Sequence, residues 1–436
     1  KRKDLEHFAD YDVYAVVDRP SHQKIIGTQW VLVDKDIPGQ SKPLRKARLC
    51  MRGDQEETQE VIHTDSPTVN PINIKLMLTE AVRKGWKISS SDVTRAFLQT
   101  TEINRNVYVY PPKEAGLPRG KVWLLKRPAY GLIDAAHAFF INFGDNLISL
   151  GCETSKMDNA TFYHFSDDSK PGDEERNLDG IVGSHIDDFL EVSNDDMRSE
   201  VIDEMKKRFT FGSQDELPFR YVGMNIDKED GNIVINQDHF IEKLVAPEMK
   251  EISSMKKETL LPEKFQTSFR SLVSKLNMLS MTARPDITFD VKVLTTKYGK
   301  ALKQDLMQAC RLLKKVKRMT TLITIPDMGD LRDLILVAYS DAATKKIDNA
   351  FSVAGHVIFL VNKATRSAVS LTWGSKKIER VVSSSLGAET IAVTKVIGSL
   401  YFIKESLKQM YGSKAGDIPC LTLIDSKDLF EAVHNI

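Results

Sequence analysis

The fold of this chain is decided by residues 180–192, GIVGSHIDDFLEV, in which Asp187 and Asp188 lie between two short apolar runs. Apolar runs of this length next to glycine indicate buried strands, so the stretch predicts a β-hairpin with both acids at its turn. At about 4 Å and an effective dielectric near 20, the two charges repel each other by roughly 4 kcal/mol. Close carboxylate pairs suit hard cations such as Mg²⁺, which usually bring phosphates with them. A solvated type I′ turn is the alternative interpretation.

A third acid lies far upstream in the chain. Residues 86–92 predict a strand that ends in Asp92, and a large aromatic residue, Phe97, follows five positions later. A lone aspartate at the end of a strand usually caps the next turn. Asp92 therefore gains a functional interpretation only if it lies beside Asp187 and Asp188.

The N-terminal part predicts a basic hairpin followed by a helix. Residues 25–34 read as a strand and residues 47–51 as its partner, across a turn at the Pro-Gly pair 38–39. The two-residue period of a strand places Lys46 and Arg48 on one face. Downstream, residues 71–84 carry the broad apolar stripe of an α-helix.

The remaining elements alternate between strands and helices. Short strands are expected at 107–110, 122–126, 219–226 and 233–235, and helices at 130–150, at 195–209 and through most of 238–320. After residue 326 the pattern predicts strands at 334–338, 351–361, 369–373 and 421–424, and a helix at 384–410.

Three acids of this last region could converge on a metal ion. Asp341 and Asp425 are expected at the ends of two strands, and Glu389 lies in the long helix. The same order of strands and helices also suits any small α/β domain, so spacing alone leaves both interpretations open.

Length and composition describe a multidomain globular chain. With 436 residues, two to four domains are expected. No run of 18 or more apolar residues occurs, which predicts no membrane span. The N-terminus has neither an initiator methionine nor the apolar core of a signal peptide, which favours a fragment of an intracellular protein. The four cysteines are isolated in sequence, so we expect them to be reduced and structural.

The net charge of +1 does not by itself indicate a nucleic-acid-binding protein, but the charges are clustered. Basic residues gather in 45–52 and 311–318, and acidic residues in an expected loop at 167–179. Each basic run can be a phosphate-binding surface or simply a solvated face.

A series of short motifs resembles one known family. They are Trp30-Val31, Lys46-Ala47-Arg48-Leu49, Ser66-Pro67, Asp92-Val93 with Ala96-Phe97-Leu98, Tyr130-Gly131-Leu132, Ile186-Asp187-Asp188, Tyr221-Val222-Gly223, Arg270-Ser271-Leu272, Thr282 to Ile287, Tyr339 to Ala342 and Thr372 to Glu389. In this order, over nearly the whole chain, they resemble the reverse transcriptase and ribonuclease H portion of the Pol polyprotein of copia-type LTR retrotransposons.

The resemblance implies a multidomain α+β and α/β fold shaped like a right hand. Residues 1–227 would form the fingers and palm, and residues 228–328 a mostly helical thumb and connection. Residues 329–436 would form a ribonuclease H-like domain that is truncated at its C-terminus, because the family pattern has a fourth acid several dozen residues after Asp425.

The resemblance also implies roles for individual residues. Asp92, Asp187, Asp188 and the backbone carbonyl of Val93 would hold two Mg²⁺ ions, with Mn²⁺ as a substitute in vitro. The incoming nucleotide would meet Lys46, Arg48, Tyr130 and Gly131, and Phe97 would be the steric gate against a 2′-hydroxyl. The primer grip would consist of Tyr221, Val222, Gly223 and Met224. Asp341, Glu389 and Asp425 would hold two further ions.

The activity implied is primer extension on RNA and DNA templates, with an associated ribonuclease H that is incomplete. Implied partners are primer–template duplex, RNA–DNA hybrid, dNTPs, a primer tRNA and a second copy of the chain, with no membrane. A cytoplasmic virus-like particle and the nucleus are the implied locations. The alternatives are a domesticated or decayed copy that binds nucleic acid as a scaffold, and a nuclease that acts mainly through residues 341–425.

Two departures from the family pattern are visible. His185 stands where the family usually has Tyr, and it can equally be a packed core histidine. Residues 133–137, Ile-Asp-Ala-Ala-His, replace a commoner Lys-Gln-Ala-Pro-Arg, which removes positive charge expected near the template.

Overall fold

The structure is a computed structural model that describes residues 1–35, 44–57, 62–166, 170, 172–347, 351–382 and 384–434. The expected turn at 38–39 and part of the expected acidic loop at 167–179 lie outside the described residues. The helices are α1 (Arg2–Asp10), α2 (Pro71–Lys84), α3 (Ala135–Ser149), α4 (Asp195–Met197), α5 (Asp203–Arg208), α6 (Asp238–Lys243), α7 (Glu263–Thr282), α8 (Thr288–Thr295), α9 (Lys303–Arg318), α10 (Ser385–Tyr411) and α11 (Lys427–His434).

Among the described residues, the strands form five sheets. The N-terminal ones have the orders β1 (Tyr14–Asp18), β7 (Lys121–Leu125), β6 (Tyr108–Val109), β2 (Ile25–Ile26), and β3 (Thr28–Lys35) with β4 (Leu44–Met51). A six-stranded sheet follows, with the order β12 (Phe211–Glu216), β5 (Lys87–Val93), β11 (Asp188–Ser193), β10 (Leu178–His185), β9 (Thr161–Phe165), β8 (Glu153–Thr154).

The two C-terminal sheets have four strands each. Their orders are β13 (Phe219–Tyr221), β14 (Met224–Glu229), β15 (Asn232–Asn236), β16 (Ile323–Ile325), and β19 (Ala368–Lys377), β18 (Phe351–Asn362), β17 (Leu334–Ile347), β20 (Cys420–Ile424). Strand β20 is parallel to β17, whereas β18 and β19 are antiparallel neighbours.

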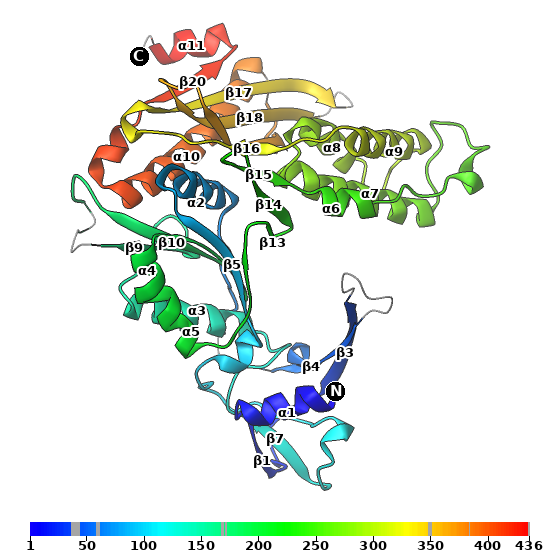
Figure 1. Cartoon of the computed structure of the whole chain (residues 1–436). Coiled ribbons are helices and arrows are strands. Elements are labelled where there is room, and N and C mark those ends of the chain that lie inside the picture. The colour runs from blue at the N-terminus through cyan, green and yellow to red at the C-terminus, as the bar shows by residue number, and fades with distance from the viewer. Residues whose placement is uncertain are drawn as a thin grey trace.

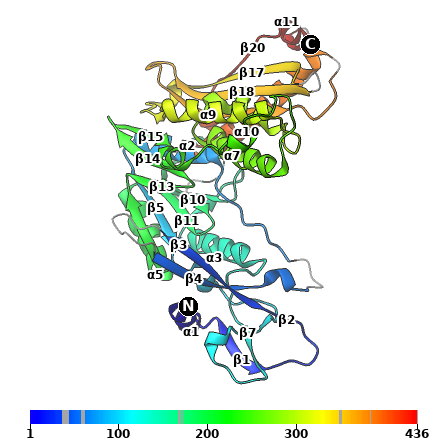
Figure 2. The ribbon, with the colours of Figure 1, turned by 90° about the vertical axis from the view of Figure 1, so that its right-hand side faces the viewer.

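The molecule is elongated, with the sheet of β1 and β7 at one end and the sheet of β17 to β20 at the other (Figures 1 and 2). The six-stranded sheet lies between them. Helices α3 and α5 share an apolar core with one of its faces, and α2 packs on the other face. Helices α6 to α9 enclose a separate apolar core beside the sheet of β17 to β20.

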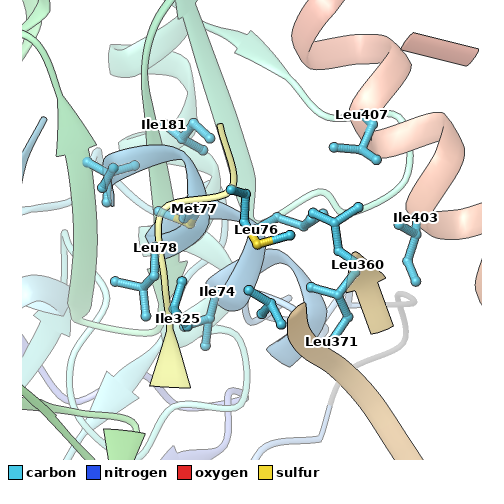
Figure 3. Close-up of a cluster of buried hydrophobic side chains, with 14 of the residues drawn as sticks. Ile74, Leu76, Met77, Leu78, Ile181, Ile325, Leu360, Leu371, Ile403 and Leu407 are labelled. Atoms are coloured by element: carbon cyan, nitrogen blue, oxygen red, sulfur yellow. The ribbon is translucent and has the colours of Figure 1, made fainter. Parts of the chain in front are cut away.

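Helix α2 is the centre of a core that joins distant parts of the chain. Its buried residues contact Ile181 of β10 on one side and Leu371 of β19 on another, and Ile325 of β16 lies beside them (Figure 3). A helix that is apolar around most of its circumference has to be buried on several sides. The broad apolar stripe predicted for residues 71–84 therefore reflects a helix enclosed by three sheets.

Polar contacts reinforce this junction. Lys75 of α2 is buried, and its Nζ donates a hydrogen bond to the carbonyl of Leu371 (2.8 Å) and lies 4.0 Å from the ring centre of Trp373. Trp373 in turn donates from Nε1 to the carbonyl of Ser280 in α7 (2.8 Å). Hydrogen bonds thus join the sheet of β17 to β20 to both α2 and α7.

By length and composition alone, α10 is the one helix in the described part of the chain that could cross a membrane. The expectation of no membrane span did not anticipate this. In the fold, Ala392, Val396 and Ile403 of α10 are buried against the sheet of β17 to β20. One face of α10 therefore packs on this sheet, whereas Ile397 and Tyr401 elsewhere on the helix are exposed.

Four of the expected elements differ in the structure. The single strand expected at 25–34 is divided into β2 and β3, which belong to different sheets. The helix expected from residue 130 begins at Ala135, because Gly131 has φ +90° and forms a turn. The single strand expected at 219–226 is two strands, since Val222 and Gly223 both have positive φ and reverse the chain. Asp341 lies inside a strand that continues to Ile347 and not at a strand end.

Candidate functional site

The register of three strands brings the first group of acids together. In the β10–β11 hairpin His185 pairs with Asp188, which leaves Ile186 and Asp187 as the turn. On the other side of β11, Asp188 pairs directly with Asp92 of β5. Directly opposed residues have Cβ atoms about 4.5–5.5 Å apart. The N–H of Val93 donates to the carbonyl of Asp187 (2.9 Å), so the turn is fastened to the end of β5.

The turn itself has an unusual backbone. Ile186 has φ +60° and is 36% exposed, and a β-branched residue rarely adopts this conformation. Asp187 does not share the positive φ, so the turn resembles type II′ and not the type I′ of the alternative interpretation. Strain of this kind costs about 1–3 kcal/mol and persists where the surroundings enforce it.

A neighbouring segment braces the hairpin. Thr68 forms a bridge with His185, and the N–H of Val69 donates to the carbonyl of Ser184 (2.8 Å). His185 is half-buried between this segment and β11. The hairpin is therefore held from both sides, which explains how the strained turn is maintained.

Electrostatics at the three acids favour a cation. Partial burial raises the pKa of Asp188, and the negative charges of Asp187 and Asp92 raise it further, while His185 acts in the opposite direction. Burial and the two neighbouring negative charges all disfavour the charged form of Asp188 unless a positive group is present. Because all the donors are carboxylate oxygens, the residues fit a hard divalent cation such as Mg²⁺.

The structure also reveals two contacts of Asp92 that sequence reasoning missed. Its Oδ1 accepts hydrogen bonds from the N–H (2.6 Å) and the Oγ (2.7 Å) of Ser213 in β12. A Cβ at Gly212 would lie 2.5 Å from Oδ2, so only glycine leaves room for the carboxylate. Nothing in the Gly-Ser pair itself distinguishes it from an ordinary turn, and only the pairing of β12 with β5 reveals it.

Three residues expected to meet the nucleotide lie together. The guanidinium carbon of Arg48 is 5.3 Å from the ring centre of Tyr130, which lies 5.2 Å from the ring of Phe97. Burial raises the pKa of Tyr130 to about 12. The positive charge of Arg48 lowers this pKa and the negative charge of Asp187 raises it. Lys46 is exposed on β4, two residues before Arg48 and on the same face.

The turn at Tyr130 and Gly131 couples this group to β4. The carbonyl of Tyr130 accepts from the N–H of Met51 (2.6 Å), and the carbonyl of Gly131 accepts from the N–H of Gly53 (3.1 Å). A Cβ at Gly131 would collide with the carbonyl of Met51, and its φ of +90° also favours glycine. Gly131 therefore permits the close approach of two backbones.

The four residues predicted as a primer grip form the β13–β14 hairpin turn. Tyr221 and Met224 are buried, and the Tyr221 hydroxyl donates to the carbonyl of Gly183 beneath the acid hairpin (3.1 Å). Val222 at the tip is 37% exposed with φ +46°, and Gly223 follows with φ +73°. Of the four residues, Val222 is therefore the exposed one, and Gly223 beside it is half-buried.

A second group of acids lies at the C-terminal sheet. Asp341 of β17, Glu389 of α10 and Asp425, directly after β20, each offer an oxygen within 4.8 Å of the others. The parallel pairing of β17 with β20 aligns Ser340 with Ile424 and so brings the two aspartates side by side.

Glu389 supplies an observation that favours a cation here. It is 6% exposed, and its Oε1 accepts from the N–H of Ala342 (3.2 Å), whereas Oε2 has no hydrogen-bond partner among the described residues. Burial raises its pKa, and the charges of Asp425 and Asp341 add to this. A buried carboxylate oxygen without a partner, facing two more carboxylates, fits a metal ligand.

Comparison with known proteins gives a consistent result. Residues 11–258 match the family described as reverse transcriptase (RNA-dependent DNA polymerase). The chain is 27% identical over 412 residues to the retrovirus-related Pol polyprotein from transposon RE1 of Arabidopsis thaliana. The alignment covers 90% of this chain and 26% of that polyprotein, so the chain spans about a quarter of the relative's length.

Two solved structures share the fold. A foamy viral protease–reverse transcriptase dRH in complex with double-stranded DNA superposes with a TM-score of 0.54 at 12% identity, covering 98% of this chain and 62% of that one. The foamy viral protease–reverse transcriptase in complex with an RNA/DNA hybrid gives a TM-score of 0.52 at 12% identity, covering 99% and 49%.

Proposed function

This chain belongs to the reverse transcriptase (RNA-dependent DNA polymerase) family, and from that premise we propose that it extends a primer on RNA and DNA templates by nucleotidyl transfer. The observation that carries the proposal is the convergence of Asp92, Asp187 and Asp188 on the register of β5, β10 and β11. The similarity to a transposon Pol polyprotein supports a copia-type retrotransposon as the source of the sequence.

The proposed subdomains follow the family's right hand. Residues 1–227 act as fingers and palm, 228–328 as thumb and connection, and 329–436 as a ribonuclease H-like domain. The separate helical core of α6 to α9 supports a thumb, and the strand order β19-β18-β17-β20 with α10 supports the ribonuclease H-like part.

The acids of the proposed polymerase site would bind metal ions together. Asp92, Asp187 and Asp188, with the carbonyl of Val93, would hold two Mg²⁺ ions, with Mn²⁺ able to replace them in vitro. Bound Mg²⁺ supplies activation of the primer 3′-hydroxyl and neutralisation of the triphosphate charge. Ser213 holds the Asp92 carboxylate in place, and the braced hairpin fixes the other two.

The residues around the acids bind and select the nucleotide. Lys46 and Arg48 would contact the triphosphate, since guanidinium groups bind phosphate in bidentate fashion. Phe97, packed on Tyr130, would exclude a 2′-hydroxyl by its size, and Gly131 lets Tyr130 approach β4. The turn at Val222 and Gly223, with the buried Tyr221 and Met224 as its base, would support the primer end.

At the C-terminal site, Asp341, Glu389 and Asp425 would hold two further divalent cations and cut the RNA strand of a hybrid. The unpartnered Oε2 of Glu389 supports this role. Cleavage of a labelled RNA–DNA hybrid measures whether three acids are enough. Further proposed partners are dNTPs, a primer tRNA and a second copy of the chain, and the proposed location is a cytoplasmic virus-like particle with access to the nucleus.

Primer extension on poly(rA)/oligo(dT) with Mg²⁺ tests the polymerase proposal. Wild-type protein is expected to incorporate dTTP, and the double variant Asp187→Asn, Asp188→Asn is expected to lose incorporation. Asp195→Asn with Asp196→Asn is a matched control, because it neutralises another adjacent acidic pair, which is exposed on α4. Incorporation that survives the first variant overturns the proposal, and hybrid binding without any incorporation favours the scaffold alternative.

A further inference from the structure

The N-terminal helix α1 lies close to the residues expected to meet the nucleotide. In both views it runs next to β4 (Figures 1 and 2). The match to the reverse transcriptase family begins at residue 11, directly after α1 ends at Asp10. The family match therefore assigns no role to α1, although this helix contacts the strand that carries Arg48.

One face of α1 is fastened to β4. His7 and Phe8 follow Asp4 by three and four residues, which places all three side chains on one side of a helix. Phe8 is fully buried. Asp4 accepts a hydrogen bond at Oδ2 from the N–H of Leu49 (2.6 Å), the residue directly after Arg48. Helix α1 thus holds the backbone of β4 beside the Arg48 position.

His7, on the same face of α1, contacts an arginine that follows β5. Its Nε2 lies 2.5 Å from Nη2 of Arg95. Because a guanidinium can only donate hydrogen bonds, Nε2 has to accept, which places the ring proton on Nδ1. Nδ1 in turn lies 3.6 Å from Oδ2 of Asp10. A neutral His7 therefore orients the guanidinium of Arg95 without neutralising its charge.

The backbone at Arg95 has a conformation that is rare for a residue with a side chain. Its φ is +53°, in the left-handed region. Arg95 lies three residues after Asp92 and two before Phe97, at the start of the short 3₁₀ helix Ala96–Gln99. Such conformations cluster at active sites and at ligand-binding sites. The turn at Arg95 is therefore typical of a side chain that is held for a ligand.

Two arginines lie close to the hydroxyl of Tyr130. Burial has the largest effect on the pKa of Tyr130 and raises it, whereas the positive charges of Arg48 and Arg95 both lower it. Because such charge effects fall off with distance, both guanidinium groups have to lie near this hydroxyl. Neither arginine forms an ion pair with a carboxylate in the part of the chain that the structure describes. Two such cations suit a ligand with more than one negative group.

We propose that α1 is part of the nucleotide site and that, through His7, it positions Arg95 as a second guanidinium for the triphosphate of the incoming dNTP. Asp4 supports the first guanidinium, that of Arg48, through the backbone of β4. Guanidinium groups bind phosphate oxygens by paired hydrogen bonds. Arg95 would touch the substrate, whereas His7 and Asp4 are positioning residues. The inference rests on the proposed function, since it assumes that a dNTP binds beside the first group of acids.

The test of Arg95 changes its charge at similar size. The measurement is the Kd of dTTP for the full chain on poly(rA) with a dideoxy-terminated oligo(dT) primer, by calorimetry with Ca²⁺ in place of Mg²⁺. Arg95→Gln is expected to weaken dTTP binding at least about tenfold, and Arg95→Lys, which keeps the charge, only about threefold. Arg119→Gln, at an exposed arginine in the turn before β7, is the control and is expected to bind dTTP like the wild type.

A double-mutant cycle tests the positioning role of His7. His7→Ala is expected to weaken dTTP binding at least about threefold. His7→Gln is expected to restore the affinity, because its amide oxygen can accept from Arg95. In the Arg95→Gln background, His7→Ala is expected to have no further effect, since the guanidinium that it positions is gone. His22→Ala, at an exposed histidine, is the control.

Three results overturn the inference: Arg95→Gln binds dTTP as tightly as Arg95→Lys, the effects of His7→Ala and Arg95→Gln add independently, or the wild type binds no dTTP. The proposed function is read separately, from primer extension with Mg²⁺. A wild type that binds dTTP through Arg95 but extends no primer contradicts the proposed function and leaves the inference standing.

Discussion

At the scale of single residues, Ser213 is the contact that fixes Asp92. Its N–H and Oγ both donate to the same carboxylate oxygen, and Gly212 leaves the space that the other oxygen needs. A carboxylate held in this way loses little freedom when a cation binds. Removing such a hydrogen-bond partner of a metal ligand lowers metal affinity or activity about 10- to 100-fold.

Ser213→Ala is expected to lower the primer-extension rate about tenfold and to raise the Mg²⁺ concentration needed for half of the maximal rate. The reason is the loss of one of the two hydrogen bonds that orient Asp92. Steady-state extension over a Mg²⁺ series checks it. Ser213→Thr keeps the hydroxyl and is expected to restore most of the rate. An unchanged Mg²⁺ dependence in Ser213→Ala contradicts the prediction.

Phe97 is a second position where a single side chain is expected to matter, here for the discrimination between ribonucleotides and deoxyribonucleotides. It packs on Tyr130, whose ring also lies against the guanidinium of Arg48. Phe97→Ala is expected to reduce discrimination against ribonucleotides roughly 10- to 100-fold, because space opens beside the 2′ position. Competing incorporation of rNTP and dNTP measures it. Phe97→Tyr keeps the bulk and is expected to discriminate normally. Equal discrimination by Phe97→Ala and the wild type removes Phe97 from this role.

At the scale of elements, two hairpin turns carry backbone strain. Ile186 between β10 and β11 and Val222 between β13 and β14 are β-branched residues with positive φ. Both tips are partly exposed, and both hairpins are anchored, the first by Thr68 and Val69 and the second by Tyr221. Such turns keep a defined shape only because their flanking strands are held.

Helix α2 carries an ionisable group, Lys75, in an apolar junction, which links stability to pH. Burial lowers the pKa of Lys75 from 10.5 to about 7. Between these values the unfolded chain binds a proton that the folded chain does not, so the Lys75 contribution to the unfolding free energy becomes more favourable as pH rises from about 7 to about 10.5.

Lys75→Met is expected to lose that contribution, so its stability should rise less with pH than that of the wild type over this window. Urea unfolding at several pH values, compared between the two proteins, measures the difference. Lys363→Met serves as a control, because Lys363 is exposed. Parallel curves for Lys75→Met and the wild type contradict the prediction.

At the scale of the whole molecule, one core crosses the boundary between the proposed palm and the C-terminal domain. Leu371 of β19, Leu360 of β18 and Ile403 of α10 belong to the same apolar cluster as Ile74 and Ile181 (Figure 3). Parts that share a core unfold together, whereas α6 to α9 have a core of their own.

Calorimetry of Leu371→Ala tests this coupling. The substitution is expected to cost about 2–5 kcal/mol and to lower the transition of the central and the C-terminal sheet together, because it leaves a cavity against α2. Leu421→Ala, on the exposed side of β20, is expected to cost less than about 1 kcal/mol. A transition of the C-terminal sheet that shifts alone contradicts a shared core.

The sequence by itself determined the elements and the identity of the acids. Local period and turn residues predicted the β3–β4 strands, α2, β5 and the β10–β11 hairpin, since side-chain alternation and glycine positions are properties of the local chain. The motif order predicted the family, which the comparison confirms. Local signals were wrong at Val222, where the chain reverses between β13 and β14 without a typical turn pair. They were also wrong at Asp341, which was predicted at a strand end, because long-range pairing extends β17 to Ile347.

Tertiary structure decided what lies beside the acids. The hydrogen bonds from Ser213 to Asp92 depend on the pairing of β12 with β5 across more than 100 residues. The unpartnered Oε2 of Glu389 lies beside Asp341 and Asp425 because α10 packs on the sheet of β17 to β20. These features depend on register and packing between distant segments, and a local sequence pattern carries no information about the distance between such segments.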